Sequence, residues 1–171
     1  MNEELPPSLE SATDNDRSKP RPFSRPVQFF AFGFGSGLSP WAPGTAGTLM
    51  AVPLYLLVSD LSLPMYSLFI AVMTLLGIWF CDVASRELGV HDHPGIVWDE
   101  FVGYWITLWA LPATWTWIIA GFVVFRIFDI IKPWPIGPLD KKVKGGFGIM
   151  VDDIVAGILA CITLHLARAL M

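Results

Sequence analysis

The sequence is poor in charged residues. Asp, Glu, Lys and Arg together make up 15% of its 171 residues, whereas an ordinary soluble domain has about 25%. Hydrophobic residues make up 54%, and the mean hydropathy of the chain is +0.56. This composition predicts an integral membrane protein of one domain. The alternative is a soluble protein with an unusually large helical core.

Cysteine and clustered basic residues are also scarce, which argues against further classes of function. The two cysteines, Cys81 and Cys161, lie in apolar segments without CxxC or Cys/His spacing. Neither a disulfide framework nor a zinc site is therefore predicted. No basic patch is interleaved with aromatic residues, which argues against nucleic acid as a partner. The expected partners are membrane lipids.

Long apolar stretches are abundant instead, and they lie at about 46–59, 65–81, 101–112, 114–131 and 151–170. A helix needs roughly 20 apolar residues to span a bilayer, and the second, fourth and fifth stretches are long enough. The first is long enough only if Gly44–Thr48 joins its helix. The third spans only if Ile96–Glu100 forms its first turn inside a protein-lined cavity; otherwise it is re-entrant. We expect an all-α protein, a small polytopic bundle of four or five membrane helices.

Lys and Arg are distributed unevenly between these stretches, and this sets the expected orientation. They precede the first stretch and follow the fourth, whereas the loop at 60–64 has none. By the positive-inside rule, the N-terminus and the segments 33–48, 82–100 and 126–149 then lie on the cytoplasmic face. Residues 1–26 are rich in Pro, Ser and charge, so we expect a disordered tail before a membrane domain at 27–171.

Five acidic residues lie at the ends of the apolar stretches: Asp99, Glu100, Asp129, Asp152 and Asp153. A carboxylate beside hydrocarbon is costly unless it is paired or bound to a cation, and Mg²⁺ prefers such hard oxygen ligands. The alternative is that the acids cap helix N-termini, where the helix dipole favours negative charge. Asp99, Glu100, Asp152 and Asp153 fit that alternative. Asp129 does not, because it lies near the end of its helix.

Two basic residues accompany Asp129. Arg126 and Asp129 are three apart on an expected helix and share a face, which Lys132 continues. Pro133 ends this helix. Arg126 either forms a simple ion pair or grips phosphate with its planar guanidinium, a geometry that Lys cannot match.

Small and hydroxylated residues fill the segment Gly33–Leu49, which precedes a helix. Backbone amides at a helix N-terminus bind anions, so Ser36, Ser39, Thr45 and Thr48 are candidate phosphate-binding residues. The alternative is that the small residues let helices pack closely. His93 lies a few residues before Asp99 and is a metal ligand, a general acid or merely solvated.

Four stretches together resemble the phosphatidylglycerophosphatase A family: GFGSGLSPWAPGTAGTL, GVHDHPGIVWDEFVGYWITL, AGFVVFRIFDIIKPWPI and GIMVDDIVAGI. They occur in the family's order, and the resemblance covers about residues 32–160. It implies a Mg²⁺-dependent hydrolase of the bacterial cytoplasmic (inner) membrane, a lipid phosphatase of phospholipid biosynthesis. Its substrate would be phosphatidylglycerophosphate, whose terminal phosphomonoester would be hydrolysed by Mg²⁺-activated water to give phosphatidylglycerol and phosphate.

The resemblance also implies roles for individual residues. The metal ligands would be Asp99, Glu100, Asp129, Asp152 and Asp153, and Glu100 is the candidate general base. Arg126 would stabilise the phosphoryl oxygens, with Glu100 and Asp129 as its catalytic partners. Substrate binding would fall to Ser36, Ser39, Thr45, Thr48, His93, Arg126 and Lys132.

Two other classes of function compete with the phosphatase. A small cation or proton transporter would use the carboxylates as a pathway and would place some of them near the bilayer midplane. A scaffold subunit would leave the acids and Arg126 without a role. The number of metal ions, attack by water or through an aspartyl-phosphate intermediate, selectivity among lipid phosphates and the oligomeric state are open at this point.

Overall fold

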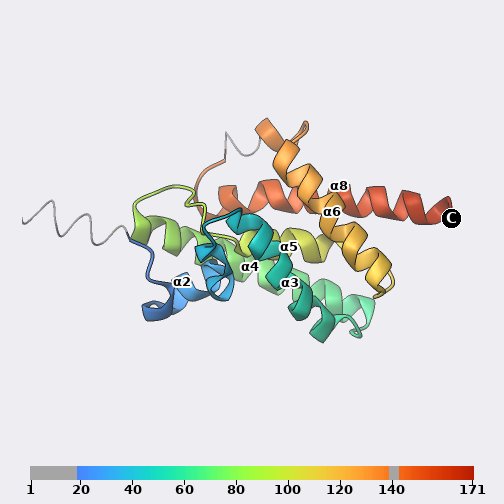
Figure 1. Ribbon diagram of the computed structural model, residues 1–171, viewed down its shortest axis with the longest axis horizontal. Coiled ribbons are helices and arrows are strands. Elements are labelled where there is room, and N and C mark those ends of the chain that lie inside the picture. The colour runs from blue at the N-terminus through green and yellow to red at the C-terminus, as the bar shows by residue number, and fades with distance from the viewer. Residues whose placement is uncertain (1–18, 139–142) are drawn as a thin grey trace, which may run out of the picture.

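The computed structural model describes residues 19–138 and 143–171. Within these residues every regular element is helical, as Figure 1 shows, and the all-α prediction is confirmed. The elements are η1 (Pro22–Ser24), α2 (Pro26–Ala31), η2 (Gly33–Leu38), α3 (Pro43–Val58), α4 (Leu63–Leu88), α5 (Trp98–Thr107), α6 (Trp115–Ile131) and α8 (Gly145–Ala169).

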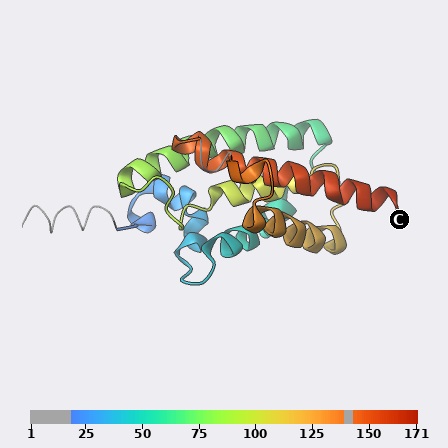
Figure 2. The same ribbon diagram turned by 90° about the horizontal axis from the view of Figure 1, so that it is seen from above.

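The short helix α5 lies at the centre of the bundle. It packs against α3, α4, α6 and α8, and Figures 1 and 2 both show it among the longer helices. Its side chains are buried almost all round, from Trp98 to Thr107. A helix buried on every side cannot be recognised by an amphipathic pattern, and α5 owes its position to the helices around it.

Two helices are long and apolar enough to cross a membrane, α4 and α8. Only 22% of the most apolar window of α4 is buried inside the protein, and Leu68, Leu75 and Trp79 are exposed. A core helix of a soluble protein would hide such residues, so the exposed apolar faces favour the membrane prediction over a soluble core. The shorter α3 includes Gly44–Thr48, as its predicted length required.

The third apolar stretch forms a helix of only half the length of a span. The helix α5 has 10 residues, or about 15 Å, against a hydrocarbon core of about 30 Å. The condition set for a span, a first turn at Ile96–Glu100 lined by protein, is met only in part: protein surrounds the first turn, but the helix begins at Trp98. Ile96 and Val97 are buried and precede the helix. The number of complete spans stays a prediction.

The last helix begins earlier than the sequence suggests. It begins at Gly145, about two turns before Asp152 and Asp153. The interpretation of these two acids as N-terminal caps is therefore wrong. The first turn packs closely against α4 through Gly146, where a Cβ would collide with the backbone carbonyl of Ile78.

The chain before α3 is anchored to the end of α4. The guanidinium of Arg25 lies 3.2 Å from the Glu87 carboxylate, and the Gln28 amide donates a hydrogen bond of 2.7 Å to the same group. The buried Gln28 also accepts a hydrogen bond from the backbone N–H of Arg21 at 2.9 Å. Of the predicted tail, residues 1–18 lie outside the described residues.

The helices α5 and α8 touch through glycine. A Cβ at Gly157 would collide with the backbone carbonyl of Gly103, and a Cβ at Gly103 would lie 2.7 Å from the carbonyl oxygen of Asp153. Small residues allow membrane helices to approach this closely. The contact holds the α5 segment around Gly103 directly against α8.

Enlarging Gly157 should separate α5 from α8. We expect Gly157→Leu to lower the free energy of unfolding by about 1–3 kcal/mol, because overpacking forces backbone shifts. Ala71→Leu enlarges an exposed residue of α4 and should have little effect. Thermal unfolding of the detergent-solubilised protein measures both variants. An unchanged midpoint in Gly157→Leu would contradict the close contact.

Candidate active site

Three carboxylates from two helices meet at one end of the bundle. Asp99 and Glu100 come from the first turn of α5, and Asp153 comes from α8. One oxygen of each lies within 4.8 Å of the other two. Two unit negative charges about 4 Å apart repel by roughly 4 kcal/mol at an effective dielectric of 20. The group therefore requires nearby positive charge.

The glycine contact explains why these acids meet. Glu100 lies one turn before Gly103 on α5, and Asp153 lies one turn before Gly157 on α8. Because the two glycines touch, the turns that precede them lie side by side, and the carboxylates share the space between them. The first turn of α5 also suits Asp99 and Glu100, since a helix N-terminus favours negative charge.

Positive charge comes from Arg126 on α6. One of its terminal nitrogens, Nη1, lies 2.5 Å from Asp129 Oδ2 and 3.8 Å from Glu100 Oε1. It also donates to the Thr48 hydroxyl at 3.5 Å. The predicted shared face of Arg126 and Asp129 is confirmed. The Asp129 carboxylate is also close enough to that of Asp153 for their charges to repel, so Arg126 and Asp129 together border the group on the side of α6.

Three buried polar atoms of this group have no hydrogen-bond partner within the described part of the chain: Asp99 Oδ1, Glu100 Oε2 and Arg126 Nε. A buried polar atom without a partner is rare and costly. The two carboxylate oxygens are acceptors that suit a cation. The guanidinium N–H is a donor that suits an anion. A ligand set with both signs of charge would satisfy all three.

The start of α3 lies directly on this group. A Cβ at Gly44 would collide with Glu100 Oε1 and would lie 3.1 Å from Arg126 Nη1 and Nη2. No described side chain caps this helix N-terminus. The Thr48 hydroxyl, which contacts Arg126, donates back to the Gly44 carbonyl at 2.9 Å. The Gly-rich segment was predicted as an anion site, and Gly44 is the position where its backbone reaches the charged side chains.

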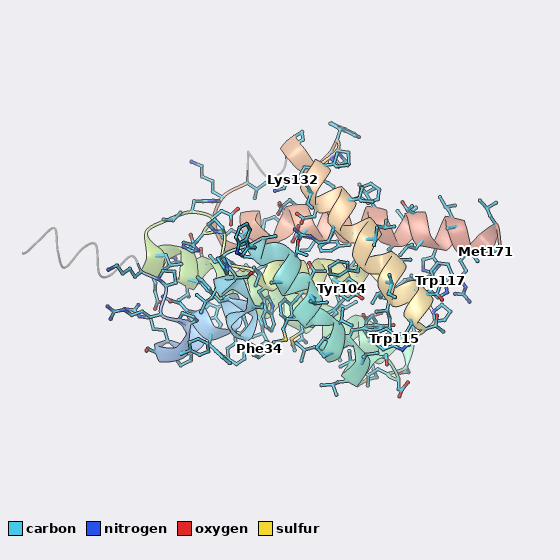
Figure 3. The ribbon with its side chains drawn as sticks, viewed as in Figure 1. Phe34, Tyr104, Trp115, Trp117, Lys132 and Met171 are labelled. Carbon is cyan, nitrogen blue, oxygen red and sulfur yellow. The ribbon has the colours of Figure 1, made fainter. Side chains whose placement is uncertain are left out.

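Lys132 and Asp152 form a separate pair. Lys132 Nζ donates to Asp152 Oδ2 at 2.7 Å. Lys132 follows the last residue of α6 and has a positive φ of 45°, and Pro133 comes next, so the predicted helix end is confirmed. Figure 3 shows Lys132 at the opposite end of α6 from Trp115 and Trp117. Asp152 is thus not among the three acids that meet, and its role as a ligand stays a prediction.

The hydroxyls predicted to bind phosphate are mostly engaged by the backbone. Ser36 Oγ donates to the Gly33 carbonyl at 2.8 Å, and Ser39 Oγ donates to the Trp41 carbonyl at the same distance. Both bonds brace the turn between α2 and α3. Thr45 is half-buried in the first turn of α3. Of the four hydroxyls, only that of Thr48 has a hydrogen bond to Arg126.

His93 braces the loop before α5. Its Nδ1 accepts a hydrogen bond of 3.0 Å from the Gly95 N–H, and its ring lies 5.5 Å from that of Phe32. Burial lowers the pKa of His93 below its ordinary value, against the opposing effect of Asp92. His93 is thus half-buried and hydrogen-bonded within its own loop. Its predicted contact with substrate stays a prediction.

The model of the family described as phosphatidylglycerophosphatase A matches residues 29–168. The chain belongs to the phosphatidylglycerophosphatase A family. The matched range includes every residue of the charged group and leaves out residues 1–28 and 169–171.

Curated relatives of this family member cover most of its length. Phosphatidylglycerophosphatase A of Escherichia coli (strain K12) is 52% identical over 138 residues, which cover 80% of each chain. Phosphatidylglycerophosphatase A of Haemophilus influenzae is 46% identical over 88% of this chain and 93% of the relative. A Bacteroides thetaiotaomicron protein named putative phosphatidylinositol-3-phosphatase is 42% identical over 86% of this chain and 96% of the relative. No solved structure matches the chain significantly.

Removing the guanidinium of Arg126 should destabilise the protein. We expect Arg126→Gln to lower the free energy of unfolding by about 3–5 kcal/mol, because breaking a buried ion pair leaves an unpaired charge. Arg126→Gln combined with Asp129→Asn should recover part of the loss, because the stranded carboxylate is then removed.

The matched control is Arg86→Gln, which breaks an exposed pair with Asp82 and should cost less than about 1 kcal/mol. Chemical denaturation in detergent measures all three variants. Equal losses in Arg126→Gln and Arg86→Gln would contradict a buried, mutually dependent charge group.

Proposed function

We propose that the protein is a Mg²⁺-dependent lipid phosphatase. It hydrolyses the terminal phosphomonoester of phosphatidylglycerophosphate and releases phosphatidylglycerol and phosphate. Two curated relatives bear the name of this activity. The structural observation that carries the proposal is the juxtaposition of partnerless carboxylate oxygens with a partnerless guanidinium N–H. A metal-bound phosphomonoester offers both charges that these atoms lack.

The acids suit a hard divalent cation. Asp99, Glu100 and Asp153 offer oxygen ligands that lie within 4.8 Å of one another, and two of these residues have an oxygen without a partner. Mg²⁺ prefers a few carboxylates together with water and substrate phosphate. When bound, the ion would supply charge neutralisation and activation of water. Asp129 and Asp152, the other two predicted ligands, lie beside Arg126 and Lys132.

The chain's own residues would bind and orient the phosphate. Arg126 has one terminal nitrogen on Asp129, which leaves its partnerless Nε to donate to a phosphoryl oxygen. Cationic donors aimed at the transferring phosphoryl group stabilise the transition state. The uncapped start of α3 at Gly44 adds backbone amides to the same site. Glu100 is the candidate general base, because its Oε2 lacks a partner that would hold it.

The site is proposed to face the cytoplasm from a bundle of four or five membrane helices. Lys132, close to the acids, and the Arg25–Glu87 pair both lie at the site end of the bundle. The other end has Arg168, which donates to the Ala110 carbonyl at 3.3 Å. A transporter would place acids along the bundle, whereas the three that meet are gathered at one end. That position supports the phosphatase over the transporter.

A phosphate-release assay tests the proposal. The purified protein should release phosphate from phosphatidylglycerophosphate with Mg²⁺, and EDTA should abolish the reaction until Mg²⁺ is restored. Phosphatidic acid, a phosphatidylinositol 3-phosphate and a soluble phosphomonoester should react more slowly. Asp153→Asn and Asp129→Asn should each lower kcat by about 100-fold or more, the scale on which loss of one electrostatic contact acts.

The matched control for these variants is Asp82→Asn. Asp82 lies at the same end of the bundle but pairs with Arg86 and the Gly146 N–H, so its loss should leave most of the activity. Full activity after thorough chelation would contradict metal dependence. Near-normal turnover by Asp153→Asn would remove that residue from the site.

A further inference from the structure

An apolar groove runs along the bundle beside the site. Its volume is about 350 Å³, and it is lined by side chains of α2, η2, α3, α4 and α5. The lining is hydrophobic throughout, with aromatic rings from Phe30, Phe34 and Phe80 at one end. Neither the metal ligands nor Arg126 takes part in it.

The groove follows α4 for about three turns. Its α4 wall consists of Phe69, Met73, Leu76 and Phe80, which are spaced so that they share one face of the helix. From Phe69 to Phe80 the helix rises about 16 Å. A single leaflet contributes about 15 Å of the hydrocarbon core. The α4 wall of the groove is thus about as long as the hydrocarbon layer of one leaflet is thick.

The polar atoms of the wall are already satisfied. Trp98 Nε1 donates to the Met73 carbonyl at 3.2 Å, and Trp105 Nε1 donates to the Ala51 carbonyl at 3.1 Å. Both indole N–H groups are thus hydrogen-bonded to backbone carbonyls, and the rings present only carbon atoms to the groove. A polar headgroup would find no hydrogen-bond partner in the groove, whereas a hydrocarbon chain would pack against its apolar walls.

One end of the groove lies at the start of α5, the helix turn that also bears two of the acids. Trp98 lines the groove and is followed directly by Asp99, the first of the three acids that meet. The other end lies at Leu57 and Val58, the last residues of α3, on the side of the bundle away from the site. A lipid whose phosphate reaches the acids at the start of α5 would thus have the near end of the groove within reach of a chain.

The groove is open to the lipid side. Leu57 is 81% exposed and Leu76 is 36% exposed, although both line it. An acyl chain can therefore enter sideways from the bilayer without crossing a polar barrier.

We propose that this groove holds one acyl chain of the lipid substrate while its phosphate occupies the acidic site; this rests on the proposed function. A chain gains no hydrophobic free energy on leaving lipid for an apolar groove. Its contribution is positional: a chain fixed beside Trp98 sets the depth of the phosphate. Fixing the reacting group in this way raises the rate of the chemical step.

Filling the groove tests this role. Leu76→Trp should lower the ratio of kcat/KM for diacyl phosphatidylglycerophosphate to kcat/KM for its deacylated headgroup, by about fivefold. Leu68→Trp is the matched control, since Leu68 is exposed on the same helix but does not line the groove, and it should keep the wild-type ratio. An unchanged ratio in Leu76→Trp would overturn the proposal, and so would an equal fall in both variants.

Photolabelling separates the groove from the proposed function, because it needs no turnover. A phosphatidylglycerophosphate with a mid-chain diazirine should label segments 54–58 and 69–80, and unlabelled phosphatidylglycerophosphate should compete where phosphatidylcholine does not. Labelling that phosphatidylcholine removes equally well would mean that bulk lipid fills the groove, and would overturn the proposal. Competed labelling without phosphate release would retain the groove and refute the phosphatase.

Discussion

The mutual repulsion of carboxylates held between α5 and α8 is the constraint on which the rest of the structure depends. The contact of Gly103 with Gly157 brings Glu100 and Asp153 together, and their charges oppose it. Arg126 offsets part of the repulsion from α6 and ties that helix to the group. The remaining negative charge supports the proposal that the site binds a divalent cation together with a phosphate.

Much of this arrangement is local and could be predicted from the sequence. The shared face of Arg126 and Asp129 follows from their spacing on one helix, and the end of α6 follows from Pro133. The separation of Asp152 from Asp153 could not be predicted. Adjacent residues on a helix point about 100° apart, so only one can face α5. Which one does is decided by distant glycines, and the sequence gives no sign of that pairing by itself.

The short helix α5 contributes residues to both the charged group and the apolar groove. Asp99 and Glu100 face the charged group, Gly103 faces α8, and Trp98 and Trp105 face the apolar groove. Each of these three contacts uses a different face of α5. A helix with one face exposed to lipid could not make all of them. The buried first turn also explains why acids are tolerated in an apolar stretch: protein, rather than hydrocarbon, surrounds them.

Binding of a divalent ion by the acids is the central claim, and electron paramagnetic resonance of Mn²⁺ titrated into the detergent-solubilised protein tests it most directly. The wild-type protein should bind Mn²⁺ in competition with Mg²⁺. Glu100→Gln and Asp153→Asn should each abolish that binding, while Asp82→Asn retains it. Binding that survives the loss of both Glu100 and Asp153 carboxylates would contradict a metal held between α5 and α8.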